Sequence, residues 1–229
     1  MLKNKKFITL QIFFLLFIIL CLGLSLLFYG KITLHSSINL SMSMAWNVFL
    51  ALLAYDFAYL CVQAKNKILK VCYGFLWLIF YPNTFYVLTD AKHFVDWLNP
   101  AKVEALIDNR TIVDFNVLIF GIIFGVVLGI WSIQLMLEAY LKHWSLKVLV
   151  VSLISFLSSI GIYVGRSEAL RLNSWDLVLH PLKTLFLILK SINGQNLGFF
   201  AAFTLCQIAL IALIYLAPQF SVKRAEKKA

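Results

Sequence analysis

The polar residues of this chain that can do chemistry gather in two short stretches. Residues 81–90 read Tyr-Pro-Asn-Thr-Phe-Tyr-Val-Leu-Thr-Asp, and His93 follows three positions later. Residues 163–176 contain two arginines and end in Asn-Ser-Trp-Asp, with His180 four positions further on. We expect the two stretches to meet at one side of the molecule. The candidate polar cluster is then Asn83, Thr89, Asp90, His93, Arg166, Arg171, Asn173, Ser174 and Asp176.

Two acid–histidine pairs, Asp90 with His93 and Asp176 with His180, have the residue types of a metal site or of an acid/base pair. Spacings of three and four residues put both members of each pair on one face of a helix. Two aspartates and two histidines can hold a divalent cation and leave a position for water. The spacing matches no zinc signature, and the alternative is that each aspartate caps a helix while each histidine lies among lipid headgroups. We therefore predict no cofactor and keep as weak metal candidates Asp90, His93, Asp176 and His180.

The two arginines of the second stretch allow two interpretations. Arg166 and Arg171 can together bind a phosphate or carboxylate group. They can equally pair with Glu168, Asp176 or Asp90, or with lipid phosphate.

The composition identifies the class of protein that must position these residues. Of the 229 residues, 62% are hydrophobic and 13% charged, whereas soluble domains are about 45–50% apolar and about 25% charged. The chain is therefore predicted to be an integral membrane protein of one domain. The chain has 20 Lys and Arg residues and 10 Asp and Glu residues. The basic residues flank the apolar runs, as topology signals do. Glycine-rich phosphate turns and nucleic-acid motifs are absent, which excludes soluble nucleotide enzymes and nucleic-acid partners.

Six apolar runs are long enough to cross a membrane as helices, since about 20 residues span its ~30 Å hydrocarbon core. A further run, residues 182–193, is too short to cross and predicts a helix lying in the interface. The fold class is thus an all-α polytopic transmembrane bundle. Its predicted spans are residues 7–29, 43–63, 68–88, 112–137, 146–164 and 197–217.

Two polar residues lie inside the second predicted span. Asn47 and Asp56 are nine residues apart, which places them on opposite sides of the helix. Asp56 must face protein or water, because a carboxyl group in lipid costs a few kcal/mol. It is either part of a proton or cation relay or a hydrogen-bonded acid that fixes helix packing.

Pro82 falls within the third predicted span and removes one helix hydrogen bond there. Asn83 and Thr84 are placed to satisfy the loosened backbone. Such a break either lines a cavity, as in transporters, or is a plain kink.

Two spans carry patterns of small residues. Gly121, Gly125 and Gly129 recur every fourth position in the fourth span and predict close approach of another helix, within the chain or in a homo-oligomer. In the fifth span, Ser152, Ser155, Ser159, Tyr163 and Arg166 share one face. That face is either a hydrogen-bonded helix contact or the wall of a wet pocket.

Orientation follows from the basic residues. If the chain crosses the membrane six times, both termini lie on the same side of the membrane. That side has 12 Lys and Arg residues, and the other side has 8. The excess predicts cytoplasmic termini and a polar cluster that faces outward.

Three blocks of this sequence resemble one family. They are Trp46-Asn47-x-Phe49-Leu50-Ala51, the stretch from Tyr81 to His93, and Arg171-x-Asn173-Ser174-Trp175-Asp176. They are similar to the signature blocks of a bacterial multi-pass membrane family catalogued as domain of unknown function 1361. The resemblance extends from the second span to the last and implies a protein of the bacterial cytoplasmic membrane, without implying a reaction. It favours as site residues Asn83, Asp90, His93, Asn173 and Asp176.

Three functions are compatible with this sequence, all with membrane lipid as a partner. We favour a non-enzymatic membrane component, such as a partner subunit, sensor or envelope accessory, in which the polar groups are already paired. A small-solute transporter would need a polar path from Asp56 to Asn83. An enzyme acting on a lipid-linked or envelope substrate would need Asp90, His93, Asp176 and His180 to converge on an open pocket.

Overall fold

The computed structural model of the chain describes residues 2–30, 39–92 and 109–222, all of them helical or in connecting turns. The helices are α1 (Leu2–Tyr29), α2 (Leu40–Gln63), α3 (Lys67–Phe80), α4 (Pro82–Tyr86), the 3-10 helix η1 (Val87–Ala91), α6 (Asn109–Tyr140), α7 (Trp144–Arg166), α8 (Ser174–Leu179), α9 (Pro181–Ser191) and α10 (Leu197–Val222).

Six helical segments in the described residues are long and apolar enough to cross a membrane. They are Phe7–Tyr29, Leu40–Gln63, Lys67–Ala91, Asn109–Tyr140, Trp144–Arg166 and Leu197–Tyr215. Each end lies within three residues of the predicted end. The prediction of a multi-pass, all-α membrane protein is therefore confirmed. The short helix predicted near residues 182–193 is α9, and its position in the interface stays a prediction.

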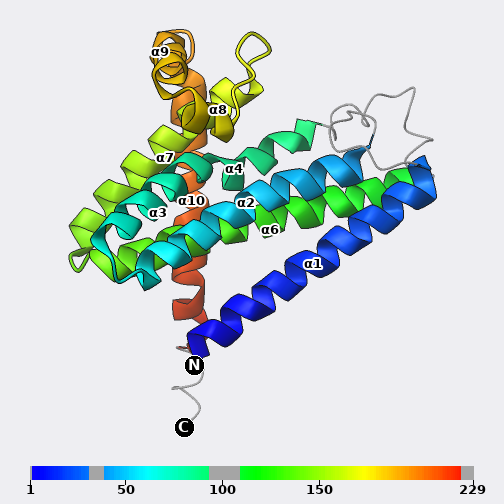
Figure 1. Ribbon diagram of the computed structural model, residues 1–229, viewed down its shortest axis with the longest axis horizontal. Helices are drawn as coiled ribbons and strands as arrows, with labels where there is room; N and C mark the ends of the chain where they lie inside the picture. Colours follow the sequence, from blue (N-terminus) through cyan, green and yellow to red (C-terminus); the bar gives the residue numbers. More distant parts are fainter. Residues whose placement is uncertain (1, 31–38, 93–108, 223–229) are drawn as a thin grey trace.

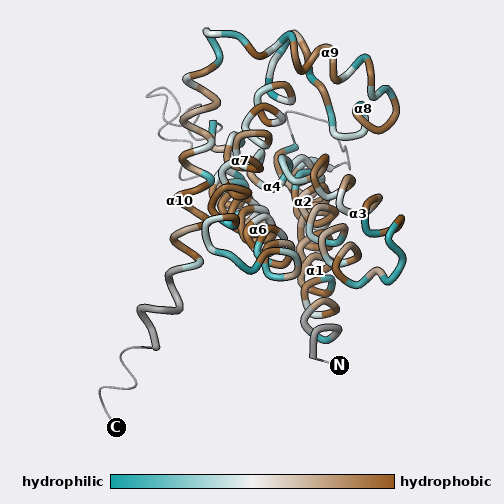
Figure 2. Tube along the Cα trace, turned by 90° about the vertical axis from the view of Figure 1, so that its left-hand side faces the viewer, coloured by the Kyte–Doolittle hydropathy of each residue, from teal (hydrophilic) through white to brown (hydrophobic). Residues whose placement is uncertain are grey.

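Several helices that pack against each other are far apart in the sequence (Figure 1). α2 lies in the centre, with α6 and α3 as its main neighbours, and α1 runs along its outer side. α7 packs against α4 and α10, and α10 runs at a steep angle to α2 and α6. α8 and α9 lie at the opposite end of the molecule from the start of α1 and the end of α10. Figure 2 shows that the long helices are mostly apolar and that hydrophilic residues concentrate in the connections.

Large apolar side chains cover much of the outer surface. Leu27 on α1, Val71 on α3 and Leu205 on α10 are 74%, 72% and 66% exposed. Isolated exposed apolar residues are common in soluble proteins, but continuous apolar faces are not. These faces are suited to contact with lipid.

The glycines of α6 allow very close helix contact, as predicted. A Cβ added at Gly121 would lie 2.2 Å from Met44 of α2, one at Gly125 would lie 2.8 Å from Val87 of η1, and one at Gly129 would lie 2.4 Å from Thr84 of α4. The chain's own helices therefore cover this face. A homo-oligomer through Gly121, Gly125 and Gly129 stays a prediction.

We expect Gly129→Ala to destabilise the protein by about 1–3 kcal/mol, because the new methyl group collides with the Cβ and Oγ1 atoms of Thr84. Thermal unfolding in detergent measures the loss. Gly23→Ala is the matched control, since a Cβ there meets no atom within 4 Å. Equal unfolding temperatures for the two variants would contradict the described packing.

Hydrogen bonds hold α1 and α10 against the other helices. Gln11 of α1 donates to Asp56 Oδ1 over 2.7 Å, a bond that the packing alternative for Asp56 expects. On α7, Ser159 accepts a bond from Thr204 of α10, and the Ser155 carbonyl accepts one from Gln207. The serine face is thus a hydrogen-bonded helix contact, as one alternative predicted.

Candidate functional site

The break at Pro82 is repaired by side chains from both polar stretches. Asn83 Nδ2 donates to the Phe80 carbonyl over 2.9 Å, and Thr84 Oγ1 donates to the Tyr81 carbonyl over 2.8 Å. Ser174 Oγ, from the second stretch, donates to the Ile79 carbonyl over 3.2 Å. Because proline removes a helix hydrogen bond, these side chains supply donors where the helix cannot. The predicted role of Asn83 and Thr84 is confirmed.

The two polar stretches lie side by side, as the sequence predicts. Asn83 Nδ2 also donates to Ser174 Oγ over 2.7 Å, across 91 positions of sequence. Trp175 packs edge-on against Phe80, with ring centroids 4.8 Å apart. The start of α8 is thereby fixed on the end of α3.

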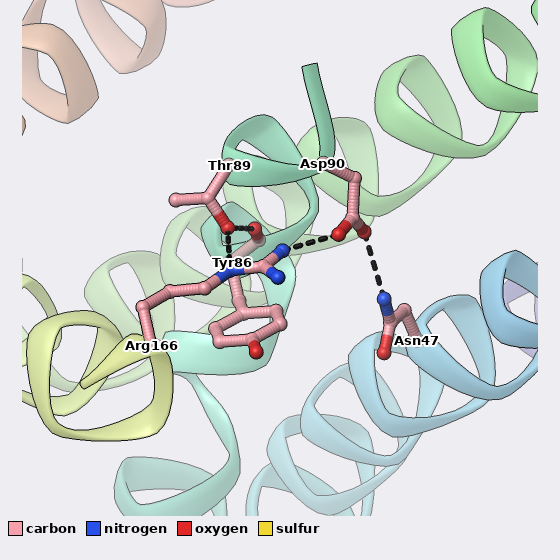
Figure 3. A network of polar contacts seen from close by, with 5 residues as sticks. All are labelled: Asn47, Tyr86, Thr89, Asp90 and Arg166. Carbon is pink, nitrogen blue, oxygen red and sulfur yellow. Dashed lines mark hydrogen bonds and ion pairs between the residues drawn. The ribbon is translucent and has the colours of Figure 1, made fainter. Parts of the chain in front are cut away.

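A buried ion pair makes the second connection between the stretches (Figure 3). Arg166, at the end of α7, forms a salt bridge with Asp90 of η1 and donates from Nε to Thr89 Oγ1. Its guanidinium lies over the Tyr86 ring, 4.0 Å from the centroid. The Asp90 and Arg166 side chains are 7% and 23% exposed.

Asn47 completes this cluster from α2. Its Nδ2 donates to Asp90 Oδ2 over 2.7 Å, so both oxygens of the carboxylate have a partner. A buried carboxylate requires such pairing. Asn47 and Asp56 thus bond to different elements, as expected for opposite sides of α2. The sequence did not indicate that Asn47 belongs to the polar cluster, because the contact joins residues 43 positions apart.

Asp176 has a structural role at the start of α8. Its Oδ2 accepts a hydrogen bond from the backbone N–H of Asn173 over 2.7 Å, and the pair forms a capping box. The Asp176 carbonyl accepts from Thr184 of α9 over 2.9 Å. The capping alternative is therefore correct for Asp176, and the bond to Thr184 holds α9 against α8.

The four weak metal candidates do not form a group in the part of the chain that the structure describes. No three His, Cys, Asp or Glu side chains lie together among these residues. Asp90 bonds to Arg166 and Asn47, Asp176 caps α8, and His180 is exposed. His93 lies outside the described residues.

A cavity of about 720 Å³ opens beside the two polar stretches, between α2, α3, α4, α7, α8 and α9. Its polar side chains come from both stretches, from α2 and from Thr184 of α9, whereas the rest of its wall is apolar. The polar set is Ser43, Asn47, Asn83, Arg166, Arg171, Asn173, Ser174 and Thr184, and the apolar set includes Phe75, Leu78, Leu157, Ile160, Leu185, Ile188 and Leu189. The volume is typical of a ligand site.

The apolar wall of the cavity was not predicted from the sequence. Leu185 and Leu189 are four residues apart on α9, which was interpreted only as a helix in the interface. The available signal was the shared face of these two leucines on a short helix.

Arg171 differs from Arg166 in having no side-chain partner within the described part of the chain. Its side chain makes no hydrogen bond or ion pair with a described residue, so it does not pair with Glu168, Asp176 or Asp90. Pairing of Arg171 with lipid phosphate stays a prediction. Its backbone is left-handed, with φ +43°, and its N–H donates to the Ser167 carbonyl over 2.8 Å. Such a conformation is uncommon for residues other than glycine.

A comparison with known protein families identifies the family of this chain. Residues 46–210 match the family described as protein of unknown function (DUF1361), over 165 of the 229 residues. The chain belongs to this family. The family match contains every polar residue of the cavity except Ser43 and leaves out α1. No curated protein and no solved structure matches the chain.

Proposed function

We propose that this family member is a non-enzymatic membrane component that binds an amphipathic molecule in the cavity between α2, α3, α4, α7, α8 and α9. The observation that supports the proposal is that the cavity wall has both polar and apolar residues. Arg166 and Leu157 both line it from α7, and they are nine residues, or about 13 Å, apart along the helix. A molecule with a polar head and an apolar chain fits such a wall.

Pairing of the polar groups favours binding over catalysis. Asp90 is occupied by Arg166 and Asn47, and Asp176 caps α8. Ser174 Oγ accepts from Asn83 and donates to the Ile79 carbonyl. None of the described residues that line the cavity is an Asp, Glu, His or Cys. The cavity therefore lacks a free general base or an activated nucleophile among its described residues.

Transport is less well supported than binding. The break at Pro82 lines the cavity, as in many transporters. Asp56, however, bonds to Gln11 of α1 and does not line the cavity. The polar path that transport requires would have to start elsewhere.

We also propose that the polar end of the cavity lies at the outer face of a bacterial cytoplasmic membrane. Two observations support this orientation. Basic residues are in excess on the side of both termini. α8 and α9 lie at the opposite end of the molecule from the start of α1.

Native mass spectrometry of the detergent-purified protein tests the proposal. We expect one amphipathic molecule to stay bound after detergent exchange has removed the lipids around the exposed helices. A protein that carries no bound amphiphile, and takes none up from a phospholipid mixture, would contradict it.

A further inference from the structure

The polar end of the cavity carries a positive charge that no described acid balances. Asp90 neutralises Arg166, but Arg171 has no partner of its own among the described residues. Arg166 and Arg171 are the charged residues among those that line the cavity. A guanidinium stays charged at any relevant pH. The described cavity therefore presents one uncompensated cation.

Arg166 retains hydrogen-bond donors despite its ion pair. A guanidinium has five N–H groups. Thr89 takes the Nε–H and Asp90 takes one of the Nη2 hydrogens. The stacking on Tyr86 and these two bonds hold the group in a fixed orientation at the cavity wall. Three N–H groups are left for a bound anion.

The turn before α8 holds the backbone of Arg171 close to the end of α7, and Arg171 lines the same cavity as Arg166. The Arg171 N–H bonds to the Ser167 carbonyl, and the Leu172 N–H bonds to the Val164 carbonyl over 3.2 Å. These bonds tie the turn to the last residues of α7, where Arg166 lies. The left-handed backbone of Arg171 is part of this turn. Two arginines that line one cavity, held on backbone segments that are bonded to each other, suit an oxyanion with several oxygens, since each guanidinium can bind two of them.

Building on the proposed function, we infer that the bound amphiphile has a phosphate head without an ammonium group. Arg171 supplies the ion pair and Arg166 supplies additional N–H donors. A headgroup amine would find no carboxylate among the described lining residues. The apolar wall selects a lipid over free phosphate, because Phe75, Leu157 and Leu189 are 56%, 42% and 58% exposed and can cover an acyl chain.

Titration of the full-length protein in detergent with lipids of identical acyl chains tests this inference. The probes are phosphatidic acid, phosphatidylglycerol, phosphatidylethanolamine and diacylglycerol, with inorganic phosphate as a competitor. We expect the two anionic lipids to bind about tenfold more tightly than the other two, from one charge-assisted contact. Arg171→Gln should abolish that preference and leave the affinity for diacylglycerol unchanged. Lys183→Gln, which removes an exposed cation of α9 outside the cavity, should preserve the preference.

The outcomes separate this inference from the proposed function. Equal affinity for phosphatidic acid and phosphatidylethanolamine would overturn the inferred head group and leave the binding function standing. A preference that survives Arg171→Gln would overturn the role of Arg171. Displacement of phosphatidic acid by millimolar inorganic phosphate would overturn the assignment of a lipid. Binding of none of the four lipids would remove the proposed function itself.

Discussion

Asp90→Ala is expected to destabilise the protein by about 3–5 kcal/mol, because it leaves the Arg166 guanidinium partly buried without its counter-ion. It also leaves the Asn47 amide without its acceptor. Unfolding in detergent by a chemical denaturant measures the change. Glu138→Ala is the control, since Glu138 is exposed near the end of α6 and exposed substitutions usually change stability by less than about 0.5 kcal/mol.

Further variants keep this prediction testable if Asp90→Ala does not fold. Asp90→Asn retains an acceptor without the charge and should be destabilised less than Asp90→Ala. The double variant Asp90→Leu with Arg166→Met removes both charges and should recover most of the lost stability, because no unpaired charge is left. If Asp90→Ala were as stable as Glu138→Ala, the ion pair would not have the structural role assigned to it.

Ile188→Trp should reduce the affinity for an amphiphile at least about tenfold. Ile188 lines the cavity from α9, so a larger side chain occupies the space of the acyl chain. Displacing two methylene groups from apolar contact costs about 1.6 kcal/mol, which exceeds the 1.4 kcal/mol of a tenfold change. Fluorescence titration with a pyrene-labelled phospholipid measures the affinity.

Leu205→Trp is the matched control for this variant. It adds the same bulk to an apolar position of α10 that is 66% exposed and lies outside the cavity. We expect its affinity to equal that of the unmodified protein. Equal affinities for Ile188→Trp and Leu205→Trp would place the amphiphile somewhere other than the cavity.

Features that depend on neighbours in sequence were predictable. The six spans follow from apolar length, and the capping role of Asp176 follows from its distance of three residues to Asn173. The repair of the break at Pro82 by Asn83 and Thr84 involves residues at most three positions away. In each case, a local backbone requirement selects a residue type at a fixed spacing.

Features that depend on the packing of distant helices were only partly predictable. The glycine spacing of α6 indicated close approach, but not that α2, α4 and η1 would supply the contacts. Asp90 was one of several possible partners for Arg166. The long arginine side chain bonds with Thr89 of η1, 77 positions away in the sequence. The cavity itself requires α9 to return against α7 through its contact with α8, which no local pattern specifies.

Photocrosslinking with a phospholipid that carries a diazirine in its acyl chain tests most directly whether the cavity binds an amphiphile. After digestion, mass spectrometry identifies the labelled residues. We expect labels on the apolar wall at Leu78, Leu157 and Ile160, and loss of these labels in Ile188→Trp. Labels found only on outward faces such as Leu27 and Leu205, with the cavity wall unlabelled, would contradict the proposed function.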